Sequence, residues 1–226
     1  MSHPSSNRGR GFSLPELLVA IVILGVLSGM IALMFGPIIS APQKHQAKVD
    51  TVQAAARAMY RMQRDIRMSS KTGIFICQND ATNPNCSSAT STLTSAPVLA
   101  ILTPRANGNG PEQYDTGGSG NPRWTGFQVY WLDDSNNLLY AFGPSSSVNS
   151  GQDNGETPGT ANAAVKLALA ASNPEIVSQN ISDVQTFLNT AGGSTIRIIG
   201  LKLTSMATDN GRTNESSLES DTVARN

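Results

Sequence analysis

The longest apolar run of the chain lies near its N-terminus. Residues 17–39 read LLVAIVILGVLSGMIALMFGPII and contain no charged side chain. As an α-helix this run would extend about 35 Å, more than the roughly 30 Å of a bilayer's hydrocarbon core. The pattern therefore predicts a membrane-spanning helix, in which Pro37 is expected to cause a kink or to end a first section. The alternatives are a cleaved secretory signal peptide, for which the run is long and lacks an evident cleavage site, and a plain signal anchor.

A second helical pattern follows the apolar run. Residues 43–70 contain no glycine or proline, and their apolar positions recur every three or four residues at Val52, Ala55, Met59, Met62 and Ile66. This spacing places the five side chains on one side of a helix. We therefore expect an amphipathic helix whose apolar stripe packs on a sheet.

Basic residues occupy the other sides of this expected helix, namely Arg57, Arg61, Arg64, Arg67 and Lys71. A solvated basic side is the simplest interpretation. The alternative is contact with lipid headgroups or with an acidic neighbouring subunit. A DNA-binding strip is less favoured, because Tyr60 is the one aromatic residue between the bases.

From residue 72 onward the pattern changes to short strand-like runs between polar loops. The expected strands are residues 73–77, 98–103, 127–132, 138–142, 184–188 and 195–203. Residues 133–137 read DDSNN and predict a hairpin loop, whereas 163–172 fit either a strand or a short helix. The predicted fold class is α+β, with a long N-terminal membrane and stalk helix packed on an antiparallel β-sheet head domain.

Composition and charge exclude several classes of function. The 226 residues include 16 basic and 16 acidic residues, two histidines and two cysteines. Zero net charge argues against a general nucleic-acid binder, and so few histidines and cysteines leave little for a zinc site or a Cys–His catalytic pair. No phosphate-binding loop or nucleophile motif occurs, and the loops around Asp115 and Asp153 lack EF-hand spacing. We therefore expect no catalytic residues, no cofactor and no metal.

The zero net charge conceals a strong segregation along the chain. Residues 44–71 carry a net charge of +5, whereas residues 72–226 carry −6. Segments of opposite charge indicate an architecture built from distinct parts rather than one uniform globule.

One acidic residue lies at the edge of the apolar run. Residues 10–18 read RGFSLPELL, so that Glu16 precedes the uncharged segment. A carboxylate in a membrane is costly unless a positive partner neutralises it, and no base lies within the run. A cut between Gly11 and Phe12 would create an α-amino group. That group could pair with Glu16 of a neighbouring copy or, one helical turn away, of its own chain.

Residues 11–16, Gly-Phe-Ser-Leu-Pro-Glu, followed by an apolar helix, resemble the type IV pilin class III leader signature. The resemblance implies cleavage after Gly11 by a membrane-embedded prepilin peptidase and N-methylation of Phe12. It also implies that Glu16 sets the register between subunits during assembly. Pro15 replaces the commoner Ile or Val, which the first turn of a helix tolerates because its N–H is not needed there.

A shorter motif near the end of the second helix narrows the resemblance. Residues 62–68, MQRDIRM, resemble the end of the long helix in W-type minor pilins and J-type type II secretion pseudopilins. Asp65 is expected to pair with Arg61 or to cap the loop that follows, the alternative being a weak surface ion pair.

The two cysteines, Cys77 and Cys86, enclose eight residues rich in turn formers. A disulfide is expected if this part of the chain lies outside the cytosol, and two free thiols are the alternative. The short basic leader favours a cytosolic N-terminus and therefore an extracytoplasmic head.

These observations predict four segments: a cleaved leader peptide (1–11), a transmembrane and assembly helix (12–39), an amphipathic stalk helix (40–71) and an extracytoplasmic β-rich head domain (72–226). The resemblance implies a minor type IV pilin-like subunit that helps to initiate or cap pilus assembly. Its expected partners are prepilin peptidase, other pilins or pseudopilins, the inner-membrane assembly platform and, before assembly, membrane lipid. The expected location is the cytoplasmic (inner) membrane, with a single span, and then a pilus or pseudopilus.

Two alternatives remain open on sequence alone. One is a type II secretion pseudopilin, and the other is an uncleaved membrane-anchored binding module whose loops 106–122 and 143–160 hold a ligand. A part in DNA uptake is compatible with the pilin interpretation, but the negative head argues against direct nucleic-acid contact.

Overall fold

The computed structural model describes residues 13–70, 72–88, 98–114, 120–144, 157–190, 197–209 and 212–223. Contacts divide the chain into two compact units, Met1–Ala47 and Lys48–Asn226. One helix, α1 (Leu14–Met68), begins in the first unit and ends in the second. The helix does not end at Pro37, contrary to one of the two outcomes expected there, since apolar helices tolerate the loss of a single backbone donor.

The first unit contains the apolar part of α1. Leu14–Phe35 is long and apolar enough to cross a membrane, and none of its side chains is buried within the chain. Apolar residues occur on every side of this segment, which is typical of a helix surrounded by lipid or by other helices rather than of a half-buried surface helix. The expected N-terminal apolar helix is confirmed.

The second unit contains a six-stranded antiparallel sheet. Its spatial order is β2 (Cys86–Ser88), β1 (Ile74–Cys77), β3 (Val98–Thr103), β4 (Gly126–Leu132), β5 (Leu138–Pro144) and β6 (Glu175–Ser178). β4 and β5 form the predicted hairpin, whose loop is held by Asp133. Its Oδ1 accepts hydrogen bonds from the backbone N–H groups of Ser135 (2.9 Å) and Asn137 (2.7 Å), and Asn136 has a φ of 60°.

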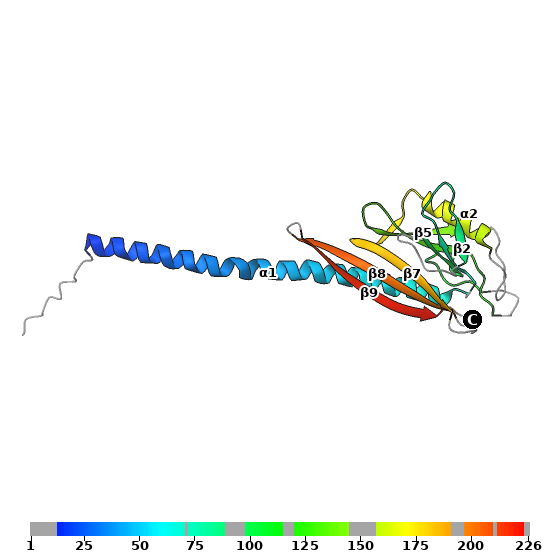
Figure 1. Cartoon of the computed structure of the whole chain (residues 1–226), viewed down its shortest axis with the longest axis horizontal. Coiled ribbons are helices and arrows are strands. Elements are labelled where there is room, and N and C mark those ends of the chain that lie inside the picture. The colour runs from blue at the N-terminus through cyan, green and yellow to red at the C-terminus, as the bar shows by residue number, and fades with distance from the viewer. Residues whose placement is uncertain are drawn as a thin grey trace, which may run out of the picture. The chain divides into compact units, whose positions relative to one another are not determined.

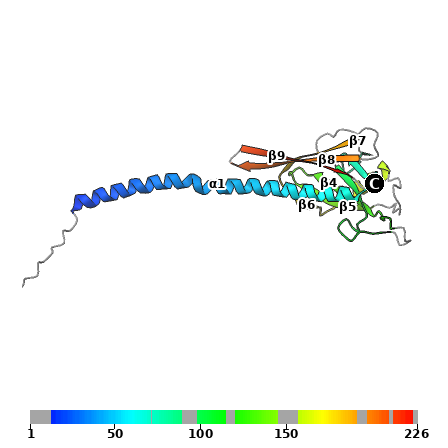
Figure 2. The same cartoon turned by 90° about the horizontal axis from the view of Figure 1, so that it is seen from below.

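A separate three-stranded antiparallel sheet follows, where a single sheet was expected. It consists of β7 (Ile181–Thr190), β8 (Arg197–Asp209) and β9 (Arg212–Val223), with β8 in the centre. Figures 1 and 2 show these strands as a ribbon beside the part of α1 that follows Lys48. β2, β6 and β9 were not predicted, because short or polar strands carry no run of apolar residues.

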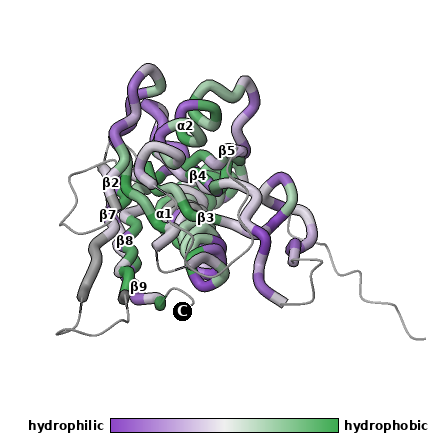
Figure 3. The backbone as a smooth tube through the Cα atoms, turned by 90° about the vertical axis from the view of Figure 1, so that its right-hand side faces the viewer, coloured by the Kyte–Doolittle hydropathy of each residue, from purple (hydrophilic) through white to green (hydrophobic). Residues whose placement is uncertain are grey.

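Two buried clusters lie on opposite faces of the six-stranded sheet. Ala55, Met59, Met62 and Ile66 of the α1 stripe pack in the first cluster with one face of this sheet and with inner residues of β7 and β8. Val52, the first residue of the stripe, is half-buried. The second cluster joins the other face to the short helix α2 (Pro158–Leu169). Figure 3 looks along the molecule and shows α1 and α2 on either side of β4. The α+β class and the packing of the predicted stripe are confirmed.

α2 settles the ambiguity at residues 163–172 in favour of a helix. Its first turn has a capping box, in which the Thr157 and Thr160 side chains each accept a hydrogen bond from the other's backbone N–H. Ala161, Ala164, Val165 and Ala168 are buried against the sheet, at the spacing of one helical face.

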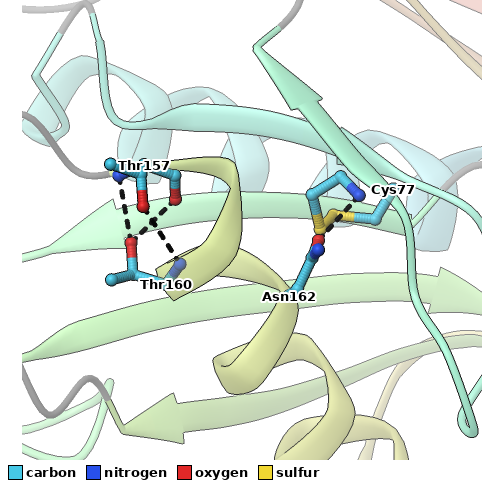
Figure 4. The surroundings of a disulfide bond; sticks show 5 residues. Cys77, Thr157, Thr160 and Asn162 are labelled. Carbon is cyan, nitrogen blue, oxygen red and sulfur yellow. Dashed lines mark hydrogen bonds between the residues drawn. A yellow bond between two sulfur atoms is a disulfide. The ribbon is translucent and has the colours of Figure 1, made fainter.

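The expected disulfide joins Cys77 of β1 to Cys86 of β2, at directly opposed positions of the strand pair. Asn162 on α2 reaches the same point, where its Oδ1 accepts a hydrogen bond from the Cys86 N–H at 2.7 Å (Figure 4). The disulfide therefore joins the two strands at this edge of the sheet, and the Asn162 hydrogen bond links the same edge to α2.

Replacing both cysteines, Cys77→Ser with Cys86→Ser, is expected to lower the free energy of unfolding by about 2 kcal/mol, because the unfolded chain regains the freedom of an open loop. Denaturant unfolding of the full-length chain in detergent, followed by tryptophan fluorescence, measures the change. Ser87→Ala, at the exposed residue of β2 that follows Cys86, is the control. Equal stability of the double variant and this control would contradict a stabilising role for the bond.

Candidate functional site: the N-terminal signal and the buried end of α1

The first turn of α1 positions Glu16. Ser13 precedes the helix, and its backbone N–H and Oγ both donate to Glu16 Oε2, at 3.4 and 3.3 Å. Ser13-Leu14-Pro15-Glu16 therefore has one half of a capping box, the half in which the side chain at the third helical position accepts from the backbone N–H of the cap residue. Both side chains are exposed, so the carboxylate is held locally by neutral donors and remains available to a cation from outside the helix.

Gly11 and Phe12, the expected cleavage and methylation positions, lie outside the described residues. The described residues that follow Phe12 in the sequence are Ser13 and then the exposed apolar helix, which includes Glu16. Cleavage, methylation and the register role of Glu16 consequently stay predictions.

The other end of α1 carries a buried polar cluster. Asp65 is 1% exposed, and its Oδ2 accepts a hydrogen bond of 2.5 Å from the Tyr130 hydroxyl on β4. Its Oδ1 accepts from Arg64 Nε at 3.1 Å and lies 3.0 Å from an Arg64 terminal nitrogen. Burial and the adjacent carboxylate raise the pKa of Tyr130 well above its usual value, which keeps the hydroxyl protonated as the donor.

Of the alternatives considered for Asp65, the pairing with Arg61 is wrong. Arg61 instead makes two bonds to the Glu175 carboxylate on β6, at 2.6 and 3.0 Å, and one to Asn109 Oδ1 at 3.4 Å. Its guanidinium also lies over the ring of Tyr140, 4.3 Å from the centroid. The spacing of four residues on a helix permits an ion pair between Arg61 and Asp65. The Glu175 carboxylate on the adjacent sheet, however, binds the guanidinium in a bidentate manner, which matches its geometry better.

The charges of Arg61 and Glu175 stabilise each other. Burial alone would lower the pKa of Arg61, but the hydrogen bond to Glu175 and the negative charge of that carboxylate raise it above its usual value. The same hydrogen bond lowers the pKa of Glu175 below its ordinary 4.5, although burial acts in the opposite direction.

The lowered pKa of Glu175 makes part of the stability depend on pH. The contribution is full above about pH 4.5 and is lost as the pH falls through the lower folded-state pKa. Since the Glu175 side chain is 49% exposed, solvent limits the contribution to below about 1 kcal/mol.

Glu175→Gln is expected to remove this component from the free energy of unfolding, measured at a series of pH values from neutral to acid. A curve with the same acid slope as the parent chain would contradict it. Glu215→Gln, at an exposed carboxylate, is the control.

Residues 6–32 match the family model for the prokaryotic N-terminal methylation motif. The match covers the second half of the expected leader, the residues around the expected cleavage position and most of the exposed apolar segment. The chain carries the type IV pilin-like signal. The signal supports a type IV pilin-like or pseudopilin protein, and proteins with this signal are structural subunits. No curated protein and no solved structure shows significant similarity to the chain.

The loop at 106–122 is described only in part. Within 106–122, Asn107 and Gly108 have φ values of 51° and 78°, and the Gly108 carbonyl accepts a hydrogen bond from the buried Gln128 at 2.8 Å. A Cβ at Gly108 would lie 2.1 Å from the Tyr140 hydroxyl, so only glycine fits this close approach. Asn109 then meets Arg61, which ties this loop to the helix.

The ligand-binding alternative for loops 106–122 and 143–160 is not tested by the described residues. Asp115 and Asp153 lie outside them, as does most of 143–160. Within the described ranges, no three His, Cys, Asp or Glu side chains gather as a possible metal site. Sequence reasoning missed Tyr130, Tyr140 and Glu175, whose importance depends on which helix residues they meet across the fold.

Proposed function

We propose that this chain is a minor type IV pilin-like subunit that helps to initiate or cap filament assembly. The observation that carries the proposal is the methylation motif at residues 6–32. The motif includes most of the apolar helix Leu14–Phe35, which has no buried side chain. A helix that is apolar on every side needs lipid or other helices around it. A subunit waiting in a membrane before joining a helical bundle meets both conditions in turn.

In this proposal prepilin peptidase cuts the chain after Gly11 and the new N-terminal Phe12 is methylated. The α-amino group of one subunit then meets Glu16 of a neighbour as the helices pack together. An opposite charge at contact distance neutralises the carboxylate, whose isolated presence among apolar helices would be costly. The pairing fixes the axial register of the subunits, because a shifted neighbour would leave both charges unpaired.

Each of the four segments of the chain has its own role in this proposed course of assembly. Residues 1–11 are the leader, 12–39 the assembly helix, 40–71 the stalk and 72–226 the head. The disulfide between Cys77 and Cys86 supports a head outside the cytosol, because such bonds persist in oxidising compartments. The inner-membrane assembly platform and other pilins or pseudopilins are the partners that this course requires.

Deletion of the chain from a cell that contains it tests the proposal. We expect far fewer surface filaments, with restoration by the full-length chain, and a low ratio of this subunit to the most abundant one in sheared filaments. Normal filament numbers with a block in exoprotein secretion would assign the chain to a type II secretion pseudopilus instead. Normal filaments and normal secretion would contradict both assembly functions.

A further inference from the structure

One exposed side of α1 in the second unit is basic. Arg57, Tyr60, Arg64 and Arg67 follow one another at spacings of three, four and three residues, which places them along one side of the helix. Arg57 and Arg67 are exposed, and Tyr60 is 70% exposed. We call these four residues the basic stripe.

The outer face of the three-stranded sheet is acidic along β9. Glu215, Glu219 and Asp221 are exposed, whereas Leu218 is half-buried and Thr222 is buried. Because successive side chains of a strand point to opposite faces, the three carboxylates share the face directed away from the core.

The neighbouring strands extend this acidic face. Asp183 of β7 is paired with Thr204, which in turn is paired with Ser217 on β9, so Asp183 lies on the same side of the sheet as the three carboxylates. Lys202 is the one base there among the side chains that the structure describes, and it pairs with Glu219 at 3.2 Å. We define the acidic face as Asp183, Glu215, Glu219 and Asp221.

Within the part of the chain that the structure describes, both surfaces retain charge that no ion pair neutralises. Among the described residues, Arg57 and Arg67 make no ion pair, and neither do Glu215 and Asp221. Arg67 donates to the neutral Thr222 hydroxyl from the inner side of β9, whereas Asp221 points to the outer side.

The two surfaces also match in length. The stripe from Arg57 to Arg67 extends about 15 Å along the helix, and Glu215 to Asp221 extends about 20 Å along β9. A row of positive charge can therefore lie along a row of negative charge without a change in either element.

We propose that the acidic face of one copy docks on the basic stripe of a second copy. Like faces would bring like charges together, so the contact joins two different surfaces. A contact between different surfaces leaves one surface of each kind unoccupied, so that a further subunit can bind there. The proposal rests on the proposed function, and it requires at least two copies of this chain to lie side by side in the group of subunits that initiates the filament.

Cross-linking of the full-length chain in its native membrane tests the docking. One tagged copy carries Tyr60→Cys and a differently tagged copy carries Ser217→Cys, both at exposed positions. A short bismaleimide should join the mixed pair at least about five-fold more than two Tyr60→Cys copies or two Ser217→Cys copies. Yields no higher for the mixed pair than for the like pairs would overturn the proposal.

Charge reversal then tests the cause of the contact. Arg57→Glu with Arg67→Glu in the Tyr60→Cys copy should lower the mixed yield about five-fold. Glu215→Lys with Asp221→Lys in the other copy should restore it to within about two-fold. Tryptophan fluorescence of each variant controls for folding. Failure of the second pair to restore the yield would overturn the docking and assign the basic stripe to another partner, such as anionic lipid headgroups.

The N-terminus of the chain in the same membranes separates this inference from the proposed function. A methylated Phe12 terminus without a mixed cross-link overturns the docking alone. An uncut terminus together with a charge-dependent mixed cross-link overturns the proposed function alone.

Discussion

A chain with Glu16→Ala is expected to be cut normally after Gly11 and to fall at least about ten-fold in filament incorporation, which corresponds to about 1.4 kcal/mol or more. The carboxylate is the one charge at the edge of an apolar helix, and its described local partners on Ser13 are neutral. Its removal would leave a neighbour's α-amino group without a counter-charge among packed apolar helices. The ratio of the variant in sheared filaments to that in the membrane measures the effect.

Glu16→Gln is the matched variant, because it separates charge from helix capping. A glutamine at this position can still accept from Ser13, as glutamine does in the capping box, but it carries no charge. We expect it to be excluded from filaments as strongly as the alanine variant. Incorporation at the parent level would show that the carboxylate acts only within its own helix, and would contradict pairing with an amine.

Asp65→Ala is expected to cost the largest amount of stability, about 3 kcal/mol in the free energy of unfolding. The substitution removes the acceptor of the buried Tyr130 hydroxyl and the partner of Arg64, and it leaves space beneath the helix. Denaturant unfolding of the full-length chain in detergent measures it, since Trp124 and Trp131 are buried in the second unit and report its loss.

Two further variants make this result specific. Asp50→Ala removes an exposed carboxylate from the same helix and should change stability by less than about 0.5 kcal/mol. Tyr130→Phe keeps the ring but leaves Asp65 one donor short, and should cost about 2 kcal/mol. Equal effects of Asp65→Ala and Asp50→Ala would contradict a structural role for the buried cluster.

The apolar pattern was sufficient for the helix, its stripe and the main strands. The stripe could be predicted because Met59, Met62 and Ile66 recur at spacings of three and four residues, which place apolar side chains on one side of a helix. The strand at Val98–Thr103 could be predicted because it is buried along its whole length, so its sequence is one apolar run. The hairpin loop followed from Asp133 and the asparagines beside it.

The same pattern could not reveal strands that bury little. β9 alternates exposed carboxylates with small or half-buried residues, so it reads as a polar tail although it pairs with β8 along its whole length. The partners of Asp65 and Arg61 were also out of reach. Tyr130 and Glu175 lie 65 and 114 residues further along the chain, and only the pairing of the sheet brings them to the helix.

The N-terminus of the chain isolated from its native membrane and from sheared filaments, determined by mass spectrometry, tests the central claim most directly. We predict a chain that begins at N-methylated Phe12 in both fractions. A chain that still begins at Met1 or Ser2, in cells with an active prepilin peptidase, would contradict the proposed processing and favour an uncleaved membrane-anchored protein.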